Sequence, residues 1–289
     1  MNQAVREQPR QGFDFLGAGL SSSALLLFLV GVSNPLGLPA AYNIFCLVIA
    51  LFLVGTFVFW ETKTSFPMLD MSLFKSSLFS LGVGARTISF ITAAAVMFLM
   101  PFYLQGVVGY TPSKTGLIMI TLALGMVLMG PIAGRLSDQF GSRPFTVFGA
   151  ALSAAGIFVL ARITEDTSLP ILLGGITLQS IGAGMFTAPN TNLILSSVPR
   201  HSYGIAAGFV QFLRTSSTVT GIAIATAIIT STMVSFNVDS NLKSLSEGID
   251  INARSAFVAG LRNTYVGMAC LQLIAVIMSA MKTQALSER

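Results

Sequence analysis

Eight apolar runs, each about the length of a helix that crosses a bilayer, dominate this sequence and constrain its fold. A spanning helix needs roughly 20 mainly apolar residues, and only helices or closed barrels can satisfy their backbone polar groups in lipid. The runs are continuous rather than alternating, so we expect helices and not barrel strands. They lie near residues 15–33, 41–60, 80–104, 115–134, 144–163, 170–190, 203–232 and 257–281.

The composition indicates the same class of protein. Hydrophobic residues make up 53% of the chain and charged residues 9%, whereas soluble domains carry about 25% charged residues. The net charge of +5 is spread over short segments between the apolar runs. It therefore reports orientation in a membrane rather than nucleic-acid binding. We predict an all-α, multi-pass protein of a cell (plasma or inner) membrane, with lipids as partners and no nucleic acid.

The basic residues between the runs predict which side of the membrane each loop faces. If the runs alternate in direction, one side holds the larger set and should be cytoplasmic. Both termini would then be cytoplasmic. The larger set is Arg6, Arg10, Lys63, Lys75, Arg135, Arg143, Arg200, Lys282 and Arg289, against Lys114, Arg162, Lys243, Arg254 and Arg262 on the other side.

The spacing of the runs predicts a two-plus-six organisation. Residues 1–60 hold the N-terminal segment and two spans. Residues 61–79 form an amphipathic, cytoplasmic linker, and residues 80–289 hold six spans with mostly short connections. Six spans are enough to form a bundle with an inward face.

The segment Gly134–Thr146 concentrates charge between two apolar runs, and we expect it to be a cytoplasmic turn. Glycine allows tight backbone turns, so Gly134 and Gly141 are expected to bend the chain there. Asp138 could face helix N–H groups and pair with Arg135 or Arg143. Two roles fit equally: a latch that holds one conformation, or a cationic loop that fixes topology and carries a capping aspartate.

A second set of candidate residues is polar and lies within the apolar runs. Arg86 is close enough to the cytoplasmic end to extend its side chain to the headgroups, and we favour that interpretation. Arg214 is deeper and must face protein or a water-filled cavity. Hydrogen bonding between helices is the alternative to cavity lining, and is favoured for all but Gln211 and Arg214. The candidate cavity-lining residues are Gln105, Gln179, Gln211, Arg214, Thr215 and Thr218.

The apolar runs lack the acidic residues and histidines that proton transfer, catalysis or metal binding would need. No Asp or Glu lies within a run, and a proton-coupled carrier usually needs an embedded carboxylate or histidine. The one histidine, His201, lies in a short turn without an acidic neighbour. Cys46 and Cys270 are far apart and have no metal or redox spacing. We expect no enzyme activity, catalytic residue, cofactor or metal, and no proton-coupling site in this chain alone.

The charged turn resembles the loop signature of the major facilitator superfamily, a family of membrane transporters. Gln139 and Ser142 stand where that signature often has basic residues. The positions that match are Gly134, Leu136, Ser137, Asp138, Gly141 and Arg143.

Other segments resemble the fourteen-span drug–proton antiporter branch of that superfamily (EmrB/QacA type). They are Asp14–Gly19, Phe59–Glu61, Pro67–Phe74, Tyr103–Tyr110 with Gly116, and Gly204–Gly208 with Arg214. The resemblance covers nearly the whole chain. It corresponds to the two extra central spans and the C-terminal six-span bundle of that branch, and not to the N-terminal bundle that holds the main coupling carboxylates.

The resemblance implies the C-terminal part of a major-facilitator-type transporter that exports small amphipathic compounds or drugs. As a single chain it should be incomplete for proton coupling. Two alternatives stay open. The chain could be a half-transporter that works with a second copy of itself or with a separate N-terminal half. It could also be a membrane scaffold or remnant without transport.

Overall fold

The computed structural model describes residues 14–33, 39–64, 71–198, 203–236, 238 and 251–281. Within these ranges, eight helices are long and apolar enough to cross a membrane. The expected all-α membrane fold is confirmed. The helices are α1 Phe15–Ser33, α2 Ala40–Glu61, α3 Ser77–Phe102, α4 Pro112–Phe140, α5 Ser142–Leu160, α6 Leu169–Ser196, α7 Tyr203–Ser235 and α8 Ile251–Met281.

The helices belong to two compact units, residues 1–73 and residues 74–289. The middle of the predicted 61–79 linker, Arg200, His201 and both terminal segments lie outside the described residues. A short 3₁₀ helix, Met71–Lys75, covers the boundary between the units. The organisation into residues 1–60, a linker at 61–79 and a six-span part at 80–289 stays a prediction.

In the first unit, α1 and α2 pack against each other. Asp14 joins the start of α1 to the end of α2. Its Oδ1 accepts a hydrogen bond from the Gly17 amide at 2.8 Å, and its Oδ2 accepts one from Trp60 Nε1 at 3.0 Å. The first bond caps the exposed amides of the helix start. The second fixes the two helices in antiparallel order, because it links opposite ends of the two sequences.

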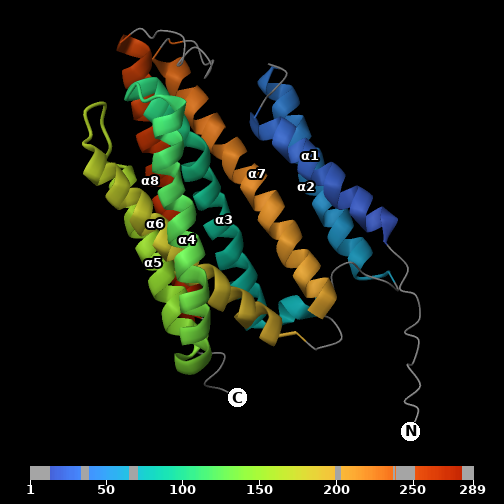
Figure 1. Ribbon diagram of the computed structural model, residues 1–289. Coiled ribbons are helices and arrows are strands. Elements are labelled where there is room, and N and C mark those ends of the chain that lie inside the picture. The colour runs from blue at the N-terminus through green and yellow to red at the C-terminus, as the bar shows by residue number, and fades with distance from the viewer. Residues whose placement is uncertain are drawn as a thin grey trace. The chain divides into compact units, whose positions relative to one another are not determined.

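In the second unit, α3 packs against α6, α7 and α8, while α6 also packs against α4 and α5 (Figure 1). The apolar core is richest around the C-terminal half of α3, where Leu99, Tyr103, Ile157 and Tyr265 are fully buried. There α3 continues into a π-helical turn, Tyr103–Val107. The Tyr103 hydroxyl donates to the Thr164 carbonyl at 2.6 Å, so the segment after α5 is fastened to this core.

The α5–α6 interface is a contact between backbones. A Cβ placed on Gly149 would lie 2.7 Å from the Phe186 amide nitrogen, and one on Gly182 would meet the backbone of Ser153. Small residues at a helix interface permit this approach in membranes. Gly174, Gly204 and Gly208 differ, because an added Cβ there would meet no atom within 4 Å. Close helix packing therefore requires glycine at Gly182 and not at those three.

The connection between α4 and α5 is shorter than expected. Gly134 lies inside α4, which continues to Phe140, and the prediction of a turn at Gly134 is wrong. The segment from Gly134 to Phe140 has no helix breaker, so the helix extends past the apolar run. The chain turns at Gly141 alone, where φ is +86°. Pro144 stands in the first turn of α5, where a proline is tolerated.

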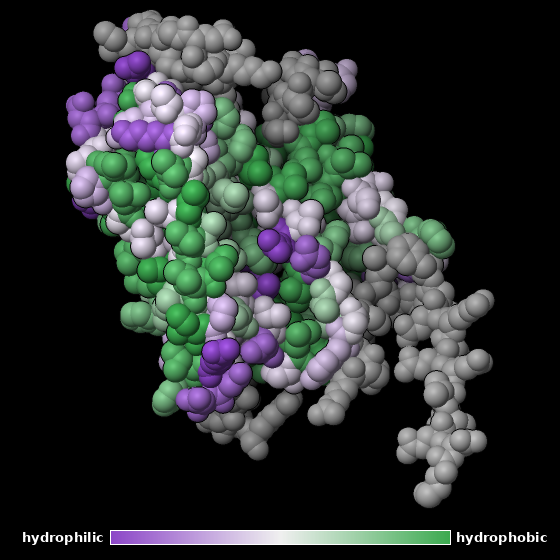
Figure 2. Space-filling view, viewed as in Figure 1, coloured by the Kyte–Doolittle hydropathy of each residue, from purple (hydrophilic) through white to green (hydrophobic). Residues whose placement is uncertain are grey.

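Figure 2 shows that hydrophobic residues cover much of the visible long side of the second unit, that hydrophilic residues gather toward its ends, and that a smaller hydrophilic group lies near mid-height. Exposed apolar side chains on α4 include Leu117, Leu124 and Leu128. A large exposed apolar surface marks contact with lipid or with another protein.

Candidate functional site: a cavity among four helices

A cavity of about 360 Å³ lies between α3, α4, α6 and α7 of the second unit. Its volume is within the range of small-molecule sites, roughly 300–1,000 Å³. Most of its wall is apolar, and a few polar groups converge on it. The apolar side chains include Phe90, Met97, Met119, Leu122, Met126 and Phe186, and the polar ones are Arg86, Ser89, Gln179, Ser180, Thr187 and Arg214.

The polar residues of the cavity lie near the middle of their helices. At a rise of roughly 1.5 Å per residue, Arg86 is about 14 Å from the start of α3 at Ser77. By the same rise, Gln179 is about 15 Å into α6 and Arg214 about 16 Å into α7. All three residues therefore lie away from both ends of their helices, each of which is longer than the roughly 30 Å thickness of a bilayer's hydrocarbon core.

Arg86 is held inside the bundle. Only 6% of its surface is exposed, and its Nη1 donates to the Thr187 carbonyl at 3.1 Å and to Thr191 Oγ1. Its guanidinium carbon lies 4.9 Å from the centre of the Phe90 ring, close enough for a cation–π interaction. Its Nε has no hydrogen-bond partner among the described residues. The prediction that Arg86 extends to the headgroups is therefore wrong, because its partners are on α6.

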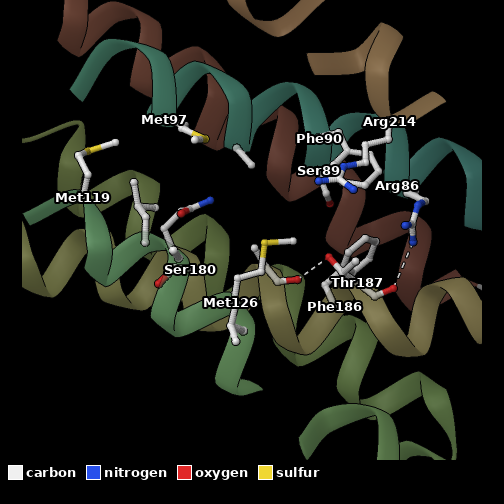
Figure 3. Close-up of a pocket in the computed structure, with 16 residues that line it drawn as sticks. Arg86, Ser89, Phe90, Met97, Met119, Met126, Ser180, Phe186, Thr187 and Arg214 are labelled. Atoms are coloured by element: carbon white, nitrogen blue, oxygen red, sulfur yellow. Dashed lines mark hydrogen bonds between the residues drawn. The ribbon is translucent and has the colours of Figure 1, made fainter. Parts of the chain in front are cut away.

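Arg214 enters the cavity from α7 and is exposed. In Figure 3, Arg86, Ser89, Phe90 and Arg214 gather at one end of the cavity, and Met97 and Met119 lie at the other. Within the part of the chain that the structure describes, the Arg214 guanidinium has no hydrogen bond or ion pair. Two cations thus define one end of the cavity, and thioether side chains define the other.

Gln179 and Ser180 are the most buried polar residues of the wall. Gln179 is 2% exposed, and its Oε1 has no hydrogen-bond partner among the described residues. Gly156 of α5 packs against it from behind, since a Cβ on Gly156 would lie 2.8 Å from Gln179 Cβ. The close α5–α6 contact therefore fixes the position of this amide at the cavity wall.

The structure brings together only part of the predicted polar set. Gln179 and Arg214 line the cavity. Gln211 and Thr215 are exposed on α7, and the Thr215 hydroxyl donates to the Gln211 carbonyl at 3.2 Å. Thr218 donates likewise to the Arg214 carbonyl at 2.8 Å. Gln105 is exposed on the π-helical turn. Gln105, Gln211, Thr215 and Thr218 are absent from the lining of this cavity.

Several lining residues were not among those predicted from the sequence. They include Ser89, Phe90, Ser180 and Thr187, and the three methionines at 97, 119 and 126. Two residue spacings in the sequence indicated that some of these residues share a helix face. Ser89 and Phe90 follow Arg86 by three and four residues, which places all three on one helix face. Met119 and Met126 are separated by two helical turns on α4.

The predicted latch residues do not form an ion-pair cluster in this structure. Arg135, Asp138 and Arg143 are exposed, and no ion pair joins them among the described residues. The start of α5 has Gly141 at its cap and no side-chain hydrogen bond. The latch role stays a prediction about another conformation, and the capping role is not seen here.

The described residues contain no group of three or more His, Cys, Asp or Glu side chains that could hold a metal ion. The cavity wall offers cationic, amide, hydroxyl and thioether groups. Such a wall can bind a ligand through charge, hydrogen bonds and apolar contact. It has no arrangement of acid, base and nucleophile among those lining residues.

These features define a class: an α-helical membrane protein with a small-molecule cavity in a six-helix bundle. The chain belongs to the major facilitator superfamily, whose family model matches residues 82–281. The family and the relatives below are transporters rather than enzymes.

Three relatives show the range of the similarity. The riboflavin transporter RibZ of Clostridioides difficile is 29% identical over 76% of this chain and 47% of its own length. The multidrug resistance protein Stp of Mycobacterium tuberculosis is 26% identical over 79% of this chain and 43% of its own. The lincomycin resistance protein LmrB of Listeria monocytogenes is 26% identical over 93% of this chain and 58% of its own length. The chain spans about half the length of the curated relatives it matches.

A solved structure shows the same fold. The crystal structure of a bacterial homolog to the human lysosomal transporter Spinster, in an inward-facing and unoccupied conformation, superposes with a TM-score of 0.57. The identity is 16%, and the match covers 94% of this chain and 66% of the other.

Proposed function

We propose that this chain is the C-terminal part of a major-facilitator transporter, of the fourteen-span EmrB/QacA type, that exports small amphipathic compounds. The cavity inside the bundle, lined by residues away from the helix ends, is the observation that carries the proposal. It combines an apolar wall with a few polar groups, which is the usual make-up of a small-molecule site. Transporters of this kind bind their substrates near the bilayer midplane.

The names of the relatives support transport of varied compounds. They include a riboflavin transporter, a multidrug resistance protein and a lincomycin resistance protein. The methionines of the wall also fit a broad specificity, because thioether side chains adapt to different shapes.

The transport pathway, in this proposal, is completed by a second bundle. That bundle is either a second copy of this chain or a separate N-terminal six-span half. The exposed polar face of α7, with Gln211 and Thr215, supports this, since polar groups at mid-depth need a protein or water partner. Both termini are proposed to be cytoplasmic.

Proton coupling is proposed to depend on that second bundle. The carboxylates in the described helices lie near helix ends: Glu61 closes α2 and Asp138 is in the last turn of α4. The cavity lining holds no carboxylate among the described residues. A pH-driven export cycle therefore requires an acid from elsewhere.

The test is efflux of cationic, neutral and anionic fluorescent amphiphiles from bacteria that lack other drug exporters. The cells express this chain alone, or this chain with the N-terminal half of RibZ. Efflux in the second arm alone supports a separate half, and efflux in the first arm supports a second copy. Ala93→Phe fills the cavity and should abolish either signal. If the protein is present in the membrane and no arm shows efflux, the proposal fails and the alternative of a membrane scaffold or remnant without transport is left.

A further inference from the structure

The charges that line the cavity have one sign. Arg86 and Arg214 both line it, and no Asp or Glu does so among the described residues. Two cations at one end of a small cavity repel each other. Charges inside a membrane protein normally pair with an opposite charge or with backbone carbonyls.

The available protein partners do not neutralise this pair. Among the described residues, Arg86 donates only to neutral acceptors, the Thr187 carbonyl and Thr191 Oγ1, and its Nε is buried without a hydrogen-bond partner. Arg214 is exposed, and its guanidinium makes no hydrogen bond or ion pair with the described residues. Burying the charge of Arg86 is costly unless a counter-charge compensates for it, and the second cation, Arg214, adds to the positive charge there. An anion held between the two guanidiniums would supply that counter-charge and accept the unused N–H groups.

The rest of the cavity defines what the anion must be attached to. Met97 and Met119 lie at the end away from the arginines, as Figure 3 shows. Gln179 Oε1 is a buried acceptor in the wall without a donor among the described residues. A ligand that satisfies all three features has an acidic group at one end, an apolar body, and an N–H or O–H between them.

We propose that this cavity selects anionic amphiphiles, with the acidic group between Arg86 and Arg214 and the apolar body against the methionines. This substrate class rests on the proposed function, which makes the cavity part of an export pathway. A small exported acid and an anionic membrane lipid present the same chemistry to the two arginines. The experiment below distinguishes these two sources.

Binding is measured on the full-length chain in nanodiscs of phosphatidylcholine, with empty nanodiscs as the blank. The two probes are anilinonaphthalene sulfonate and phenylnaphthylamine. They share the aromatic groups and the N–H, and they differ by the sulfonate. The sulfonated probe is expected to bind about ten-fold more tightly, as a charge-assisted contact of roughly 1.4 kcal/mol would give. Equal affinities would overturn the proposal.

Substitutions locate the preference. Arg214→Gln should weaken binding of the sulfonated probe about ten-fold and change phenylnaphthylamine by less than about two-fold. Arg214→Lys keeps the charge and should restore most of the affinity. The matched control is Arg162→Gln, at an exposed arginine after α5 that lies over the Phe158 ring. Circular dichroism checks that the Arg214→Gln protein keeps its helices. If the folded variant binds both probes as the unaltered chain does, the assignment of Arg214 as an anion contact is overturned.

Ala93→Phe fills the cavity and should remove saturable binding of both probes. If both still bind, they occupy another surface and the proposal fails. Nanodiscs with phosphatidylglycerol separate the two sources. If phosphatidylglycerol competes with the sulfonated probe, a membrane lipid is a ligand of the cavity. If it does not compete, the ligand is a small acid. Because binding needs no export, a failed efflux test with intact anion selectivity contradicts the proposed function alone.

Discussion

Arg86 of α3 and Thr191 of α6, 105 residues apart in the sequence, form a 2.6 Å hydrogen bond between Nη1 and Oγ1. Together with the bond from Arg86 to the Thr187 carbonyl, it joins two helices at the cationic end of the cavity. The position of this charge therefore depends on α6 as much as on α3.

Thr191→Val should destabilise the protein. It removes an acceptor from a buried, charged donor, and such hydrogen bonds contribute about 1.5–3 kcal/mol. Thermal unfolding in one detergent measures the loss. Thr215→Val is the control, because that exposed hydroxyl bonds only within its own helix; it should change stability by less than about 0.5 kcal/mol. Equal effects at the two sites would show that the Arg86 contact contributes little.

Gly182→Ala and Gly174→Ala test the α5–α6 packing within one helix. At Gly182 the new methyl group meets the backbone of Ser153 and Gly149, which cannot move aside easily. Overpacking of this kind costs about 1–3 kcal/mol. At Gly174 the methyl group meets nothing within 4 Å, so the higher helix propensity of alanine should stabilise by up to about 1 kcal/mol. Unfolding of both variants by heat gives the comparison, and a stable Gly182→Ala protein would contradict the close contact.

Gly141→Ala should destabilise the α4–α5 junction, whereas Gly134→Ala should not. Gly141 has a φ of +86° and a ψ of 149°, a conformation essentially restricted to glycine that costs other residues about 1–3 kcal/mol. Gly134 is helical, and an added Cβ would lie 3.7 Å from Ala188 Cβ, an ordinary contact. Thermal unfolding and protease sensitivity at this junction measure the difference. Greater damage from Gly134→Ala would mean that the turn is at Gly134 after all.

Asp138→Asn tests the latch. Asp138 is exposed and makes no ion pair among the described residues, so stability should change by less than about 0.5 kcal/mol. A latch role predicts that a cysteine at position 93 reacts about five-fold faster with a cytoplasmic reagent, as a coupling of about 1 kcal/mol gives. Cys46 and Cys270 are first replaced by serine, and Gln139→Asn is the control. Unchanged stability and reactivity would leave only the topology-fixing role.

The sequence predicted the helices well because a membrane span depends on a local property, the length of an apolar run. It also indicated Gln179 and Arg214, whose depth in their runs made lipid exposure too costly. The end of α4 was harder to predict. Apolar runs end where lipid ends, but α4 continues to Phe140 because no proline or glycine lies between Gly134 and Gly141 to interrupt it.

The remaining errors concern contacts between distant segments. The burial of Arg86 depends on Thr187 and Thr191 of α6, which no spacing within α3 reveals. Gln211, Thr215 and Thr218 share α7 with Arg214, but the rotation of α7 against α3 decides which of them reaches the cavity. That rotation follows from close contacts such as Gly221 with Ile91, which only the folded structure shows.

The three methionines should make the cavity less selective for the apolar part of a ligand than for its acidic group. An unbranched thioether chain changes rotamer at little cost, so the wall at Met97, Met119 and Met126 follows the outline of whatever lies against it. Reshaping the apolar part of a ligand should then alter affinity little, whereas moving or masking its acidic group should alter it steeply. On the proposal that the cavity selects anionic amphiphiles, esterifying the acidic group of a ligand should weaken its binding more than changing its whole hydrocarbon skeleton.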